Sequence, residues 1–174
     1  AQPMGFTFDY FGVNYTDAYI SSNGFLTFLP GQSNGCCSGQ PIPTAVSPDA
    51  IIAAWWEDLY PPGGGSIQYQ TLGVAPNRYF IAQYTNLPHF SSGNPVTMQV
   101  KLFEGTNVIE VHYQDAPSDS GTHSAGVENE TGTVGVQYVL QSTGLVTPLA
   151  VQYTPATAVT ASASDLPLTP GIGS

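Results

Sequence analysis

The residues of this chain that could do acid–base or metal chemistry are three histidines and a small set of acids. His89, His112 and His123 lie on separate segments, and none belongs to an H-E-x-x-H or similar metal-binding spacing. The chain has no G-x-S-x-G nucleophile elbow and no phosphate-binding glycine loop before a helix. Glu57 and Asp58 could serve a glycosidase only at a defined carboxyl separation, which the sequence does not give. We therefore predict that the protein is not an enzyme.

Calcium is the metal that the acidic residues favour. They occur at the ends of predicted strands and in loops, where hard oxygen ligands suit Ca²⁺. The chain contains no EF-hand and no nonapeptide calcium repeat, and acids that are simply solvated are the alternative. The predicted calcium ligands are Glu57, Asp58, Asp115, Asp119 and Glu128, with Glu130 nearby in the chain.

The two cysteines, Cys36 and Cys37, are adjacent in a loop over 29–46 that is rich in Gly, Pro, Ser and Asn. In an oxidising compartment they are expected to form a disulfide, either with each other or with another chain. Two cysteines without a Cys or His partner at the right spacing do not make a tetrahedral zinc site.

Aromatic residues and two sequons offer surface chemistry. Tryptophans beside acids can stack on sugars, so a ligand-stacking role is the alternative to a core role for Trp55, Trp56, Tyr60 and Tyr69. Asn14 and Asn129 each begin an N-x-T sequon at a predicted turn, and glycosylation there is an alternative to an ordinary turn role.

Composition narrows the class of protein. The 174 residues suit one domain with a sizeable core, and hydrophobic residues make up 41%. Only 8% of residues are charged, against a usual ~25%, and two basic residues face twelve acidic ones. A net charge of -10 excludes binding to nucleic acid and to anionic membranes through a basic patch. No apolar stretch approaches the ~20 residues of a membrane span, and the start at Ala1-Gln2 is expected to follow signal cleavage.

Short strands separated by turns run along the chain, without a helical period. Phe6, Phe8 and Tyr10 alternate with polar residues, and Asn23-Gly24 between apolar runs is a strong hairpin signal. The pattern predicts an all-β, antiparallel β-sandwich of about ten short strands, jelly-roll-like, over 1–153, followed by a Pro/Ala/Ser/Thr tail over 154–174. The predicted strands are 6–10, 17–21, 25–28, 51–56, 66–72, 79–84, 96–103, 108–113, 124–127, 134–140 and 149–153.

Several of these segments together resemble nidogen-like β-sandwich modules of secreted bacterial and archaeal proteins. The resemblance begins with FTFDYFGVNYTDAYISSNGFLTF and continues with PDAIIAAWWEDLY, SIQYQTLGVAPNRYFIAQY, VTMQVKLFEGTNVIEVHY and SAGVENETGTVGVQY. It covers roughly 6–153. It implies the sandwich fold and an adhesive or accessory role, although fold does not fix function.

The two ends of the chain suggest how copies could join. In the family that this chain resembles, a further strand usually precedes the opening aromatic segment, so one sheet edge is expected to be open to another strand. The tail alternates small polar and apolar residues and could add to such an edge, in its own subunit or in the next. The predicted assembly residues are Val159, Ala161, Ala163, Leu166, Leu168 and Ile172.

The sequence thus predicts a secreted, extracellular, non-enzymatic protein with a structural or adhesive role. Its sharper form is a self-assembling filament or surface-layer subunit whose main partner is itself, joined head-to-tail by strand addition. The alternatives are a carbohydrate- or matrix-binding module and an accessory domain of a secreted hydrolase.

Overall fold

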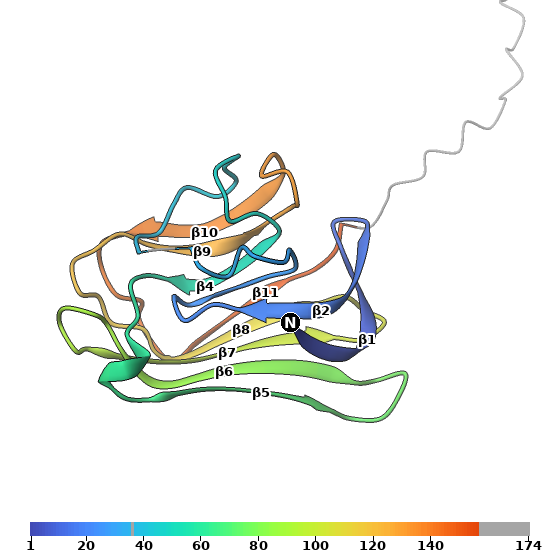
Figure 1. The fold of residues 1–174 in the computed structure, drawn as a ribbon, viewed down its shortest axis with the longest axis horizontal. Helices are drawn as coiled ribbons and strands as arrows, with labels where there is room; N and C mark the ends of the chain where they lie inside the picture. Colours follow the sequence, from blue (N-terminus) through green and yellow to red (C-terminus); the bar gives the residue numbers. More distant parts are fainter. Residues whose placement is uncertain (36, 157–174) are drawn as a thin grey trace, which may run out of the picture.

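Two antiparallel sheets pack face to face in the computed structural model, which describes residues 1–35 and 37–156 (Figure 1). The six-stranded sheet has the order β1-β2-β3-β4-β9-β10, and the five-stranded sheet has the order β11-β8-β7-β6-β5. Within the described residues the elements are β1 (Gln2–Tyr10), β2 (Val13–Ile20), β3 (Phe25–Thr27), β4 (Ile51–Trp56), η1 (Pro61–Gly63), β5 (Ser66–Leu72), β6 (Tyr79–Pro88), β7 (Pro95–Phe103), β8 (Ile109–Asp115), β9 (His123–Glu128), β10 (Gly135–Gln141) and β11 (Leu149–Tyr153). The predicted all-β sandwich is confirmed.

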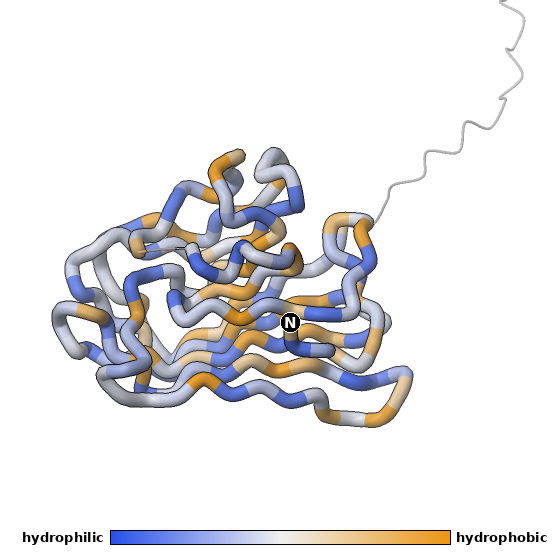
Figure 2. The backbone as a smooth tube through the Cα atoms, viewed as in Figure 1, coloured by the Kyte–Doolittle hydropathy of each residue, from blue (hydrophilic) through white to orange (hydrophobic). Residues whose placement is uncertain are grey.

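Strand alternation fixes which side chains enter the core. Along β6 and β7, buried residues alternate with half-buried ones, as Figure 2 shows for hydropathy. Met98, Val100 and Leu102 lie on one face of β7 and are buried, because successive side chains of a strand point to opposite faces. The polar positions of the same strands face outward. The alternating pattern of this sheet was therefore readable from the sequence.

Strand β4 does not alternate, because both of its faces are covered. Ala54 and Trp55 pack in the main core between the sheets, whereas Ile51, Ala53 and Trp56 pack with Ile42 in a second cluster. Ile42 belongs to the loop after β3, which crosses the outer face of the six-stranded sheet. The loop is held there by hydrogen bonds from Ile42 N to Gln137 Oε1, 3.0 Å, and from Thr44 N to Glu128 Oε2, 2.9 Å. The continuous apolar run of β4 follows from this double burial.

Strand β4 contains a register break, and a backbone group freed by this break forms a hydrogen bond to the other sheet. The pairing of β4 with β9 shifts between Ala53 and Trp56. Over this stretch the N–H groups of Ala54 and Trp55 donate to the carbonyl of Gly24 instead, both at 3.0 Å. The buried hydroxyl of Tyr113, from the five-stranded sheet, donates to the Ala54 carbonyl at 2.6 Å. The Ala54 carbonyl, left unpaired by the register break, thus finds a hydrogen-bond donor across the core.

Three sets of predictions can be placed on this fold. Strand β1 forms one edge of the six-stranded sheet, as expected for a sheet without a preceding strand. Cys36 and the assembly residues Val159, Ala161, Ala163, Leu166, Leu168 and Ile172 lie outside the described residues. No helix in the described part of the chain is long and apolar enough to cross a membrane.

We expect a glycine-to-alanine pair to separate backbone strain from close packing. Gly24 has φ +75° and its added Cβ would lie 2.0 Å from the Trp55 carbonyl oxygen. Gly12 has φ +84° with nothing within 4 Å. Gly24→Ala should therefore lower the free energy of unfolding by roughly 3 kcal/mol or more, and Gly12→Ala by about 1 kcal/mol. Urea denaturation of both variants measures this, and equal losses would contradict the close-approach argument.

Candidate functional site

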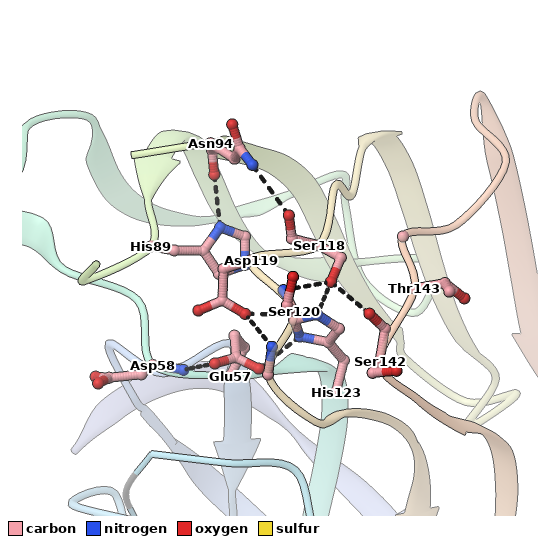
Figure 3. A network of polar contacts seen from close by, with 12 residues as sticks. Glu57, Asp58, His89, Asn94, Ser118, Asp119, Ser120, His123, Ser142 and Thr143 are labelled. Carbon is pink, nitrogen blue, oxygen red and sulfur yellow. Dashed lines mark hydrogen bonds and ion pairs between the residues drawn. The ribbon is translucent and has the colours of Figure 1, made fainter. Parts of the chain in front are cut away.

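One end of the sandwich holds two histidines and three acids: His89, His123, Glu57, Asp58 and Asp119. Glu57 directly follows β4, His123 begins the neighbouring strand β9, and His89 directly follows β6 of the other sheet. Asp119 comes from the loop between β8 and β9. The side chains of His89, Asp119 and His123 point toward one another, and one ligand atom from each lies within 4.8 Å of the others (Figure 3). The site thus joins both sheets.

The His89 ring is held by one of its nitrogens. Its Nδ1 lies 2.6 Å from the backbone carbonyl oxygen of Asn94. A carbonyl only accepts, so Nδ1 carries the proton of this bond, and in the neutral ring Nε2 has the free lone pair. That Nε2 atom is buried and has no hydrogen-bond partner among residues 1–35 and 37–156. An unpaired buried nitrogen costs free energy unless something binds it.

The His123 ring lies between a carboxylate and a hydroxyl. Its Nδ1 is 2.5 Å from Glu57 Oε2, in an arrangement too bent for a regular hydrogen bond. Its Nε2 is 2.9 Å from Ser118 Oγ. The Ser118 hydroxyl is also placed to donate to the Ser142 carbonyl, at 2.7 Å, and it has one proton for the two acceptors. Trp55 stacks on the ring, with centroids 4.6 Å apart.

The loop that carries Asp119 is fitted closely to the site. The Gly121 N–H donates to Asp119 Oδ1 at 2.7 Å, and Ser120 has φ +80°. A Cβ on Gly121 would lie 2.9 Å from Asp119 Oδ1 and 3.0 Å from Glu57 Oε1. Only glycine leaves room for both carboxylates here. Asp119 Oδ1 also faces His123 Nε2 at 3.8 Å.

Negative charge is concentrated at this end of the molecule. Burial raises the pKa of Asp58, and the carboxylates of Glu57 and Asp119 raise it further, while His89 lowers it. The chain has two basic residues, and both lie elsewhere: Arg78 pairs with Glu104, and Lys101 lies opposite Glu110 in the β7–β8 pair. Neutralisation of these carboxylates therefore falls to the histidines or to a bound cation.

The five predicted calcium ligands do not form one site. Within the described residues, the only group of three or more potential ligands is His89, Asp119 and His123, which includes one of the five acids. Asp115 is exposed at the end of β8. Glu128 ends β9 and His123 begins it, which separates them by roughly 17 Å at 3.3 Å per residue. Glu57 and Asp58 adjoin Asp119, but imidazole nitrogens dominate the group, and calcium prefers oxygen.

Both tryptophans take the core role, and their burial leaves no room for the alternative ligand-stacking role. Trp55 and Trp56 are fully buried, because β4 is covered on both faces. Tyr69 is 48% exposed on β5, and Tyr60 is 39% exposed. Tyr60 packs edge-to-face on Phe90, which is itself 61% exposed, with centroids 5.0 Å apart. No pattern in the sequence indicated Phe90 as a surface residue of interest.

The predicted modification sites lie in different settings. Asn14 is exposed within β2 rather than in a turn. Asn129 does lie in a turn, where its Nδ2 donates to Thr131 Oγ1 at 3.0 Å and its Oδ1 accepts from the Thr133 N–H at 2.9 Å. A glycan on Asn129 would disturb that Nδ2 bond. With Cys36 outside the described residues, the disulfide of Cys36 and Cys37 stays a prediction.

A groove opens between the free edges of the two sheets, away from the histidines. It holds about 770 Å³ and is lined mainly by residues of β1, β8, β9, β10 and β11 and by the residues that follow β11. Val134 and Val136, at the start of β10, are 55% and 56% exposed in it. Pro155 and Ala156, where the described chain ends, also line it.

A family model described as NIDO related matches residues 1–168. The chain belongs to the NIDO-related family. The resemblance to nidogen-like modules is thus confirmed, and membership indicates an extracellular module. No solved structure matches this NIDO-related chain.

The histidine pair is what sequence reasoning missed in this NIDO-related module. His89 and His123 are 34 residues apart and come from different sheets, so no spacing rule connects them. One weak signal was present: Asp119 lies four residues before His123 in the Gly/Ser-rich segment SDSGTH. The Glu57–His123 contact depends on the pairing of β4 with β9, which cannot be read from the sequence.

We expect Glu128 to make the stability of the module pH-dependent. Burial raises the pKa of Glu128 from 4.5 to about 7, Asp49 adds to the shift, and the Thr44 N–H opposes it. The folded state then holds a proton that the unfolded state releases, so stability is full below about pH 4.5 and falls as pH rises through about 7. Glu128→Gln should remove this fall, worth about 1–2 kcal/mol after solvent screening.

Melting temperatures between pH 4 and 8 measure this dependence. The matched control is Glu130→Gln, since Glu130 is exposed two residues away. If Glu128→Gln and the wild type lose stability in parallel over this range, the titration of Glu128 does not contribute.

Proposed function

We propose that this NIDO-related module is an extracellular structural or adhesive protein that assembles with its own copies by strand addition. The observation that carries the proposal is the apolar groove between the free edges of β10 and β11. Among the described strands, β10 pairs only with β9 and β11 only with β8, so within this part of the chain each offers an unpaired row of backbone groups. Unpaired edges beside apolar surface are templates for another strand.

The edge of β10 is suited to an incoming strand. Val136, Tyr138 and Leu140 are exposed along it, and β10 is neither charged nor interrupted by proline. Natural proteins usually protect a free edge with lysine, proline or a covering loop. An unprotected apolar edge therefore favours pairing with a partner.

The proposed occupant is residues 157–174 of a second copy. The stretch 158–164, AVTASAS, alternates as a strand does and is seven residues long, as β10 is. The whole segment carries one charge, Asp165, so it can enter an apolar groove with little desolvation cost. Each copy would donate one segment and receive one, which makes the contact head-to-tail and the assembly open-ended.

Deletion of residues 157–174 tests the assembly. We expect filaments or concentration-dependent oligomers of the full chain by negative-stain electron microscopy and light scattering, and monomers after the deletion. Val136→Lys should also give monomers, because it places a charge in the groove. A synthetic 157–174 peptide should bind the deleted protein but not its Val136→Lys form.

The matched control is Val146→Lys, which makes the same change at a residue 92% exposed outside the groove. It should assemble like the wild type. A full chain that stays monomeric at all concentrations would refute assembly, and a monomer that loses thermal stability on deletion would place the segment in its own subunit.

Glycan binding is the second candidate function, and the exposed pair Tyr60 and Phe90 favours it. Two aromatic rings on the surface next to Asp58 offer a stacking face beside a hydrogen-bond acceptor. A glycan array should then show binding that Tyr60→Ala reduces by about tenfold, while Tyr69→Ala, on the five-stranded sheet, leaves it unchanged. An array without binding to the wild-type protein would exclude this function.

A further inference from the structure

We propose that His89, His123 and Asp119 bind one divalent transition-metal ion of the zinc class, and that this ion fastens the two sheets together. The site is distinct from the groove of the assembly proposal and shares no residue with it. The direction of the lone pairs, the charge of the site and its closed surroundings all favour a bound ion.

The two histidines are oriented as metal ligands usually are. A metal-binding histidine donates its other ring N–H to a carbonyl or a carboxylate, which fixes the tautomer and aims the free nitrogen at the ion. His89 Nδ1 donates to the Asn94 carbonyl in this way, whereas His123 Nδ1 lies 2.5 Å from Glu57 Oε2 in an ion-pair contact that is too bent for a regular hydrogen bond. Both remaining Nε2 atoms are then ligands, with Asp119 supplying an oxygen (Figure 3).

The open coordination position is visible as an unsatisfied atom. His89 is 1% exposed, and its Nε2 has no hydrogen-bond partner. On the other side, His123 Nε2 contacts the hydroxyl of Ser118, which has the Ser142 carbonyl as a second acceptor. Rotation of this hydroxyl toward Ser142 would free Nε2 without loss of a bond for Ser118. Nothing else in the described residues competes for the two nitrogens.

Ligand type decides which ion fits. Two imidazoles and one carboxylate suit Zn²⁺, Co²⁺ or Fe²⁺ and do not suit Ca²⁺, which requires six or more oxygens. The ligand atoms lie within 4.8 Å of one another, and tetrahedral bonds of about 2.0–2.2 Å would place them about 3.4 Å apart, which requires side-chain movements of up to roughly 1.4 Å. A divalent ion would also neutralise carboxylates that have no Lys or Arg beside them in the described residues.

The position of the ligands gives the ion a structural role. His89 follows β6 of the five-stranded sheet, and His123 begins β9 of the six-stranded sheet. One ion bound by both would cross-link the sheets at an end where Gly121 and Trp55 close the site tightly. Such a link stabilises the folded state because the unfolded chain does not present the three ligands together.

Cobalt titration of the chelator-treated full chain tests the proposal. We expect one equivalent of Co²⁺ to give the visible d–d absorption of a nitrogen- and oxygen-ligated ion, to be displaced by Zn²⁺ but not by Ca²⁺, and to raise the melting temperature. His89→Gln and Asp119→Asn should weaken binding by more than about tenfold. Glu57→Gln should weaken it by about tenfold to hundredfold through the orientation of His123.

Two matched controls make the result specific. His112→Gln changes a half-buried histidine that pairs with Glu110, and Asp115→Asn changes an exposed acid at the end of β8. Both should bind Co²⁺ like the wild type. A wild type without d–d absorption, a thiolate-to-cobalt charge-transfer band, binding of Ca²⁺ in preference to Zn²⁺, or unchanged affinity in His89→Gln would each overturn the proposal.

Discussion

The register break in β4 is the constraint on which the rest of the structure depends. Because the ladder to β9 is interrupted between Ala53 and Trp56, the backbone there pairs with Gly24 on one side and with the Tyr113 hydroxyl across the core. The break accompanies the burial of both tryptophans, Trp55 in the main core and Trp56 beneath the loop over the outer face. It also places Glu57 at the end of the strand beside His123, so the same backbone feature that ties the sheets together sets up the histidine site.

The two proposed activities use opposite properties of one sandwich. Where the sheets are closed at the end of β4, polar groups are buried, and several of them, among them His89 Nε2 and Glu57 Oε2, have no hydrogen-bond partner within the described residues. Where the sheets are open, between β10 and β11, apolar side chains remain exposed beside unpaired backbone. Burial makes the first region suitable for a tightly held ion, and exposure makes the second suitable for a partner strand.

The scarcity of Lys and Arg leaves most acids without an ion pair and the β10 edge without a protecting charge. With two basic residues for twelve acidic ones, few ion pairs are available: Arg78 pairs with Glu104, and Lys101 lies opposite Glu110 in the β7–β8 ladder. Acids elsewhere have to be solvated, hydrogen-bonded or protonated, and Glu128, with its pKa of about 7, is the buried case. An uncharged β10 edge is a further consequence, since lysines that would protect it are absent there.

The sequence by itself determined the fold class, the family and the position of most strands, but not the bounds of β1 and β2, which both begin four residues before their predicted starts. Local patterns can be read directly from a sequence, and here they are the period-2 alternation in β6, β7 and β8, the Asn23-Gly24 turn and the aromatic opening segment. The tertiary structure decided which faces are covered and which distant residues meet. It buried Trp55 between the sheets and Trp56 beneath the loop that crosses β4, it placed Glu128 at the opposite end of β9 from the histidine site, and it joined His89 to His123. Those outcomes depend on strand pairing and sheet packing between residues far apart in the chain, which no spacing in the sequence encodes.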